Sequence, residues 1–145
     1  MNRLEQIAVL NRLLDVLTSS LPVYLERMQP WVRRGAENGL AVLARIAADQ
    51  RALAARVAGA IVERRGQPAP GHFPIEFTAF NDLAVEYLVG KAAERQRRDV
   101  QAIARAAREL RESPTLTSLA EEVLGHAHRH LKALEGVSTE DFSRQ

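Results

Sequence analysis

The chain has 145 residues, of which 26% are charged and 46% hydrophobic, with a formal net charge of +2 and no cysteine. This length suits one domain with a core of its own, and the absence of cysteine excludes disulfides, thiolate metal sites and cysteine nucleophiles. Nearly all cations are arginine, with lysine only at Lys91 and Lys132. Because arginines and glutamates are interspersed, we attribute this bias to composition and not to phosphate recognition.

The start of the chain predicts neither a membrane span nor a signal peptide. Its longest charge-free stretch, residues 16–25, is about ten residues long, half of what a membrane helix needs. Glu5, Arg12 and Asp15 interrupt any apolar signal-peptide core. We therefore expect a cytoplasmic protein that does not bind membranes.

Apolar residues at helical spacing predict an all-α fold. The first helix covers about residues 2–28, with a kink at Pro22. The second covers about residues 32–65 and ends at Gly66 in the C′ position. A stretch rich in proline and glycine at residues 66–74 then begins a long connection, which suits a bundle with one crossover.

Two further helices complete the predicted fold. The third begins between residues 75 and 81 and continues to about residue 111, where Ser113-Pro114 breaks the chain. The fourth covers about residues 115–134, with Thr117 or Ser118 as its cap and Gly136 as its end.

The first helix carries two parallel apolar lines, and one bundle core needs only one of them. The second line consists of Val9, Leu13, Val16 and Val23. We therefore expect a homodimer formed through the first helix and a neighbouring helix. A single bundle domain should cover residues 1–136, followed by a disordered tail at residues 137–145.

Polar residues interrupt the apolar seams near the middle of the bundle. Gln50 lies on the seam of the second helix, where an unpartnered buried amide would cost about 1–3 kcal/mol. Residues 94–99 of the third helix are all polar, and Glu94 continues the seam seven residues after Tyr87. His130 lies on the seam of the fourth helix.

Three stretches resemble the first, second and last helices of bacterioferritins and rubrerythrin-type proteins, which belong to the ferritin-like superfamily. They read LNRLLDVLTSSLPVYL at residues 10–25, IAADQRALAARVAGAIVERRGQPAP at residues 46–70 and EEVLGHAHRHLKALE at residues 121–135. The resemblance implies an antiparallel four-helix bundle in up-down-down-up order, with the long crossover between helices 2 and 3. In such bundles two helices each supply a Glu and two each supply a Glu-x-x-His to a di-iron centre.

Most of the di-iron ligands that the resemblance implies are replaced in this chain. The six corresponding positions are Leu17, Gln50, Leu53, Glu94, Ala127 and His130. Only Glu94 and His130 keep the expected ligand. We therefore expect no di-iron centre, no cofactor and no ferroxidase or peroxidase activity. The implied function is that of a non-catalytic structural or protein-interaction module with an unidentified protein partner.

Three interpretations of the remaining polar residues stay open. The first interpretation is a polar layer that fixes the register of the helices through mutual hydrogen bonds. It would contain Gln50, Glu94 and His130, joined by Arg98. Alternatively, Glu94 and His130 bind one metal ion, in a metal-handling protein. The third interpretation is a small-ligand pocket in the bundle core where the metals would lie.

A second candidate metal site lies on the fourth helix. His126 and His130 share one face at a spacing of four residues, whereas His128 points elsewhere. Glu122 precedes His126 by one turn and completes a candidate surface zinc site. The alternative is that these histidines are simply solvated.

Arginines of the third helix suggest a basic stripe. They are Arg95, Arg97, Arg98, Arg105, Arg108 and Arg111. Acidic neighbours such as Glu94 and Asp99 dilute the stripe, so we expect no binding of nucleic acid. The sequence shows neither a nucleophile with a matching base nor a glycine-rich phosphate loop.

Overall fold

The computed structural model describes residues 1–28, 36–81 and 83–140. Every regular element in these residues is a helix, which confirms the all-α prediction. The elements are α1 (Arg3–Thr18), α2 (Leu21–Met28), α3 (Glu37–Glu63), the short 3-10 helix η1 (Ile75–Phe80), α4 (Val85–Glu109) and α5 (Pro114–Glu140). Within the same residues, none of the helices combines the length and the apolar character that crossing a membrane requires.

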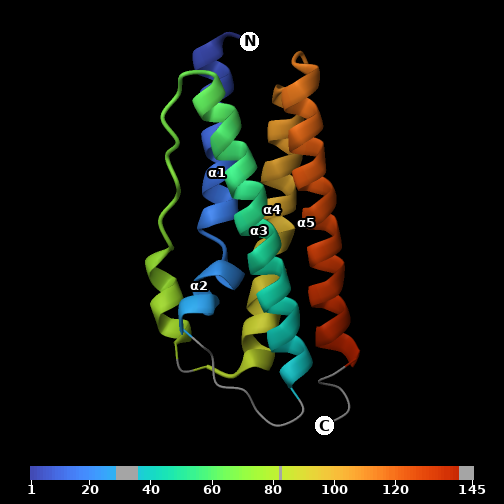
Figure 1. Ribbon diagram of the computed structural model, residues 1–145. Coiled ribbons are helices and arrows are strands. Elements are labelled where there is room, and N and C mark those ends of the chain that lie inside the picture. The colour runs from blue at the N-terminus through green and yellow to red at the C-terminus, as the bar shows by residue number, and fades with distance from the viewer. Residues whose placement is uncertain (29–35, 82, 141–145) are drawn as a thin grey trace.

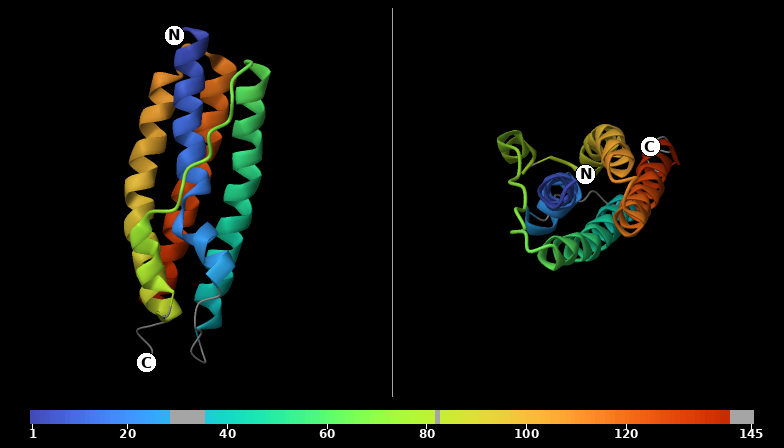
Figure 2. Two further views of the ribbon diagram at one scale, coloured as in Figure 1. Left: turned by 90° about the vertical axis from the view of Figure 1, so that its left-hand side faces the viewer. Right: turned by 90° about the horizontal axis from the view of Figure 1, so that it is seen from above.

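The long helices α1, α3, α4 and α5 lie side by side, with α1 and α5 running in one direction and α3 and α4 in the other (Figure 1). Each of α1 and α5 packs against both α3 and α4. The connection from α3 to α4 returns along the whole length of the molecule over the outer side of α1 (Figure 2). This crossover is what makes α3 and α4 parallel.

The crossover is attached to α1 by polar side chains. The Asn11 side chain accepts a hydrogen bond from the Ala69 N–H at 2.7 Å and donates one to the Gln67 carbonyl at 3.2 Å. Two turns after Asn11, the Thr18 hydroxyl accepts a hydrogen bond from the Gly71 N–H at 2.9 Å. These bonds satisfy backbone groups in a stretch that has no regular structure of its own.

The predicted first helix is in fact two helices, and the break precedes Pro22. Thr18 and Ser19 donate their hydroxyl groups to carbonyls of the last turn of α1, at 2.7 Å for Leu14 and 2.6 Å for Asp15. Ser20 then caps α2, because its hydroxyl accepts from the Val23 N–H at 3.3 Å. Pro22 therefore lies in the first turn of α2, where the missing N–H breaks no helical hydrogen bond.

The C-terminus of α3 differs from the prediction by one residue. The left-handed C′ position is occupied by Arg65, with φ of 61°, and not by Gly66. The Gly66 N–H bonds the Ile61 carbonyl at 2.9 Å and the Arg65 N–H bonds the Val62 carbonyl at 2.9 Å, which is the Schellman arrangement. At the other end, the predicted start near residue 32 lies outside the described residues, and α3 begins at Glu37.

The third predicted helix is also divided. Its expected start is the separate helix η1, and α4 itself begins only at Val85. The ring of Phe77 in η1 is fully buried and lies 5.4 Å from the ring of Tyr24 in α2. Aromatic packing against α2 therefore closes this end of the core and holds η1 in place.

The fourth predicted helix begins earlier and ends later than expected. Ser113 is its cap, with its carbonyl accepting from the Thr117 N–H at 2.8 Å, and Pro114 occupies the first helical position, which proline favours. Thr117 lies inside α5 and donates its hydroxyl to the Ala107 carbonyl at 3.1 Å. The helix passes through Gly136 to Glu140, so the start of the predicted tail is helical. Residues 141–145 lie outside the described residues.

The second apolar line of the predicted first helix, which runs over α1 and α2, is buried within the single chain. Val9, Leu13 and Val23 are at most 9% exposed, and Val16 is half-buried. The chain itself thus covers the wide apolar face. The width of this face therefore no longer argues for a homodimer, which stays a prediction.

Candidate functional site

A small cavity lies between the four long helices, near the middle of α3, α4 and α5. The space in it that is open to the centre of a water molecule is about 10 Å³, enough for about one water. The cavity is lined by Leu17, Gln50, Leu53, Ala127 and His130, together with Gln96, Asp99, His126 and three apolar residues. Five of the six positions that the ferritin-like resemblance singles out therefore meet at one place in the fold.

Glu94 is the exception, and its predicted place on the buried seam is wrong. Its side chain is exposed and its carboxylate lies 3.4 Å from the ammonium group of Lys91. Tyr87, the seam residue from which Glu94 was placed, is itself 49% exposed. The proposed pairing of Glu94 with His130 in one metal site is therefore not formed.

Gln96 occupies the buried position on α4 instead. It is 3% exposed, and its amide nitrogen donates to the Ala127 carbonyl at 3.0 Å. The true seam runs through Val89, Gln96 and Val100, all of which are buried. The small apolar residues Ala92 and Ala93 carry the signal for this seam, because Gln96 follows them at helical spacing.

Gln50 is buried as predicted, but its partner is Ser20. The Ser20 hydroxyl donates to the Gln50 side-chain carbonyl at 2.5 Å while accepting from the Val23 N–H. This bond connects the middle of α3 to the cap of α2. The predicted layer in which Gln50, Glu94 and His130 bond to one another is therefore wrong, because each has a different partner.

His130 pairs with Asp49, a residue that the sequence analysis did not single out. The His130 Nε2 lies 2.9 Å from the Asp49 Oδ2, and His130 is 6% exposed. Burial lowers the pKa of His130, although the hydrogen bond and the charge of Asp49 act in the opposite direction. The lowered pKa favours the neutral imidazole. Because a carboxylate only accepts, the tautomer with hydrogen on Nε2 donates this hydrogen bond.

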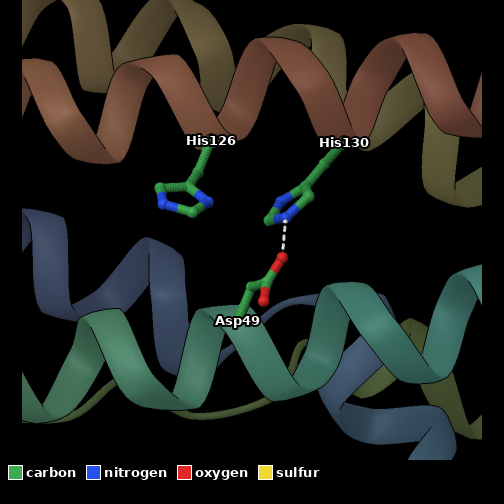
Figure 3. A group of neighbouring side chains, drawn as sticks. All are labelled: Asp49, His126 and His130. Carbon is green, nitrogen blue, oxygen red and sulfur yellow. Dashed lines mark hydrogen bonds and ion pairs between the residues drawn. The ribbon is translucent and has the colours of Figure 1, made fainter.

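His126 joins this pair from the preceding turn of α5. The two imidazole rings have centroids 5.9 Å apart. Figure 3 shows the His130 ring directed at the Asp49 carboxylate, which projects from α3, and the His126 ring beside it on α5. One potential ligand atom from each of Asp49, His126 and His130 lies within 4.8 Å of the others. His128 is exposed, as its spacing predicts.

Of the predicted trio of Glu122, His126 and His130, the structure brings the two histidines together with Asp49. Metal binding by these residues stays a prediction. The carboxylate of Glu122 accepts two hydrogen bonds from Arg56, at 2.7 and 2.8 Å, and Asp49 takes its place. No local pattern links Asp49 to the histidines, since they lie on different helices. The only available signal was Gln50, whose buried position places the neighbouring Asp49 at the edge of the same interface.

Asp99 brings a second carboxyl group to the cavity. Burial raises the pKa of Asp99 to about 6, against the opposing charges of Arg95 and Arg98 and with a smaller contribution from Asp15. This carboxyl therefore gains a proton under mildly acidic conditions, unlike an exposed aspartate.

No protein-family model matches the chain, and neither does any curated protein or solved structure. The resemblance to ferritin-like proteins therefore depends on the residues of this chain alone.

Carboxylates accompany the arginines of α4. Arg97 pairs with Glu135 at 2.9 Å, and Arg95 lies 4.7 Å from the centre of the Phe77 ring. Arg105, Arg108 and Arg111 line a surface hollow of about 430 Å³ together with Glu5, Glu109 and Glu112. Acidic side chains thus lie among these arginines, as predicted. The absence of nucleic-acid binding stays a prediction.

Proposed function

We propose that the chain is a ferritin-like four-helix bundle that has lost its di-iron centre and acts as a structural or protein-interaction module, not as an enzyme. Two observations support the ferritin-like assignment. The long crossover between α3 and α4 gives the helix directions typical of that family. Five residues assigned to ligand positions from sequence line one cavity.

The single observation that carries the loss of function is the lining of this cavity. A di-iron centre needs four carboxylates and two imidazoles, but Leu17, Leu53 and Ala127 contribute only apolar groups. Gln50 is already bonded to Ser20. The remaining space of about 10 Å³ holds about one water molecule. So small a space supports the loss of a centre that would hold two metal ions with bound oxygen.

Iron loading tests this proposal. The purified protein is incubated aerobically with ferrous iron beside a bacterioferritin with an intact ligand set. We expect fewer than two iron atoms per chain after removal of unbound metal, and iron oxidation no faster than in buffer. Two iron atoms per chain, or oxidation at the rate of the bacterioferritin, would contradict it.

A homodimer through α1 and a neighbouring helix stays part of this proposal, although the second apolar line is covered within the chain. Sedimentation at micromolar concentration measures it directly. A dimer would agree with the prediction. A monomer would contradict it, and the interaction partner would then be a different protein.

A further inference from the structure

Asp49, His126 and His130 bring together the ligand types that transition metals prefer. The group contains two imidazoles and one carboxylate, and their ligand atoms all lie within 4.8 Å of one another. In a tetrahedral zinc site with bonds of about 2.0–2.2 Å, the ligand atoms stand roughly 3.3–3.6 Å apart. Small side-chain rotations thus separate the present arrangement from a coordinated one.

The helices hold these three side chains in place without a metal. His126 and His130 are four residues apart on α5 and therefore project from one face of it. Asp49 projects toward them from α3 (Figure 3), and α3 and α5 pack directly against each other. Binding a metal therefore orders little additional chain.

We propose that Asp49, His126 and His130 bind a single divalent transition-metal ion of the zinc type, with water as a fourth ligand. Two imidazoles and a carboxylate leave an open position, as in zinc sites with three protein ligands. Both histidines also line the mid-bundle cavity, which has room for about one water. The amides of Gln50 and Gln96 and the carboxyl of Asp99 line the same cavity and offer that water hydrogen-bonding groups.

This site differs from the lost di-iron centre. Asp49 and His126 occupy none of the six positions that the ferritin-like resemblance assigns, and only His130 is shared. The site holds one ion and not two, and it lies at the α3–α5 interface. It is therefore independent of the proposed loss of iron chemistry, and the number of ions per chain distinguishes the two proposals.

Neighbouring charges favour a cation at this place only moderately. Glu122 interacts electrostatically with His126, but its charge is largely balanced by Arg56. Arg129 contributes a positive charge near His130. The Asp49 carboxylate is therefore the essential anionic ligand, and its removal is the sharpest test.

Cobalt binding to the full chain measures the site. Co²⁺ replaces Zn²⁺ in tetrahedral sites and gives them intense visible absorption, so one titration reports affinity, stoichiometry and geometry. After stripping with a chelator, we expect about one Co²⁺ per chain, displaced by Zn²⁺. We expect the conservative variants Asp49→Asn and His126→Gln to weaken binding by about tenfold or more.

His128→Gln is the matched control, because it removes an exposed histidine from the same helix. We expect its affinity to stay within about twofold of the unchanged protein. His126 is only half-buried, so His126→Gln should keep the fold, which circular dichroism checks. Equal Co²⁺ affinity in the unchanged protein, Asp49→Asn and His126→Gln would overturn the proposal, as would the absence of visible Co²⁺ absorption in the unchanged protein.

Discussion

At the scale of single residues, the carboxyl of Asp99 makes the stability of the protein depend on pH. Its pKa rises from 3.8 to about 6 on folding, so the folded state binds the proton more tightly than the unfolded chain. The free energy of unfolding therefore falls as the pH rises from about 4 to about 6. Above this range the ionised group costs up to about 3 kcal/mol.

The Asp99→Asn variant should remove that cost. We expect it to raise the free energy of unfolding by about 1–3 kcal/mol near pH 7.5 and to change it little near pH 4. Urea unfolding at both pH values measures the difference. Glu94→Gln is the control, because it changes an exposed carboxylate on the same helix. An equal effect of Asp99→Asn at both pH values would show that burial does not perturb this group.

Arg65 offers a second test, because it adopts φ of 61° at the C-terminus of α3. A non-glycine residue in this left-handed conformation is strained by about 1 kcal/mol, and glycine is not. We expect Arg65→Gly to stabilise the protein by about 0.5–1 kcal/mol in urea unfolding. Arg64→Gly should destabilise it, because Arg64 has φ of −96°. If both variants destabilise, strain at residue 65 is not significant.

The buried polar positions were predictable where one helix carried the signal. Gln50 interrupts a regular apolar seam, and its burial follows from the spacing alone. Glu94 was misplaced because a run of polar residues in α4 hides the phase of the helix. The phase depended on Tyr87, an amphipathic side chain that lies at the edge of the core. A shift of two residues was enough to exchange Gln96 for Glu94.

At the scale of elements, two glycines test whether the helix and the crossover are constrained differently. A methyl group at Gly59 in α3 would meet no atom within 4 Å, whereas one at Gly71 would overlap the Asp15 carboxylate and lie 3.1 Å from the Asp15 carbonyl. We expect Gly59→Ala to stabilise the protein by about 1 kcal/mol. Gly71→Ala should destabilise it by about 1–3 kcal/mol. Thermal unfolding of both variants measures these shifts, and a neutral Gly71→Ala would mean that the crossover adjusts freely.

The ends of the helices were less predictable than their existence, because short-range polar contacts decide them. The hydroxyl groups of Thr18, Ser19 and Ser20 bond the backbone at the junction of α1 and α2. The sequence predicts one continuous helix with a kink at Pro22, because proline is the stronger conventional signal. At α5, by contrast, serine followed by proline began a helix where we had expected only an interruption.

At the scale of the whole molecule, the directions of the helices were implied by the ferritin-like resemblance and agreed with the long connection. Contacts between distant helices did not follow from the sequence. Asp49 and His130 are 81 residues apart, and their pairing depends on how far α3 slides along α5. Apolar seams fix which faces meet and leave this axial position open. The candidate metal site therefore became visible only in three dimensions.

The ferritin-like interpretation makes a prediction about the whole bundle, since it states where a di-iron centre would form. Restoring the ligands requires Leu17→Glu, Gln50→Glu, Leu53→His and Ala127→Glu beside the existing His130. The remaining carboxylate must come from α4, and the sequence and the structure differ on which residue of α4 faces the centre. Gln96 lines the cavity, so a chain that also carries Gln96→Glu presents the complete set inside the bundle, and one that relies on Glu94 does not.

We expect the variant with Gln96→Glu to bind two ferrous ions per chain and the variant without it to bind fewer. Buried carboxylates without a metal repel one another, so the complete variant should be unstable alone and gain thermal stability with ferrous iron under anaerobic conditions. Elemental analysis and melting curves measure both effects. Two ions bound by the variant without Gln96→Glu would indicate that Glu94 supplies the α4 ligand, as the sequence predicts. No binding in either variant would mean that the cavity does not correspond to a ferritin-like centre.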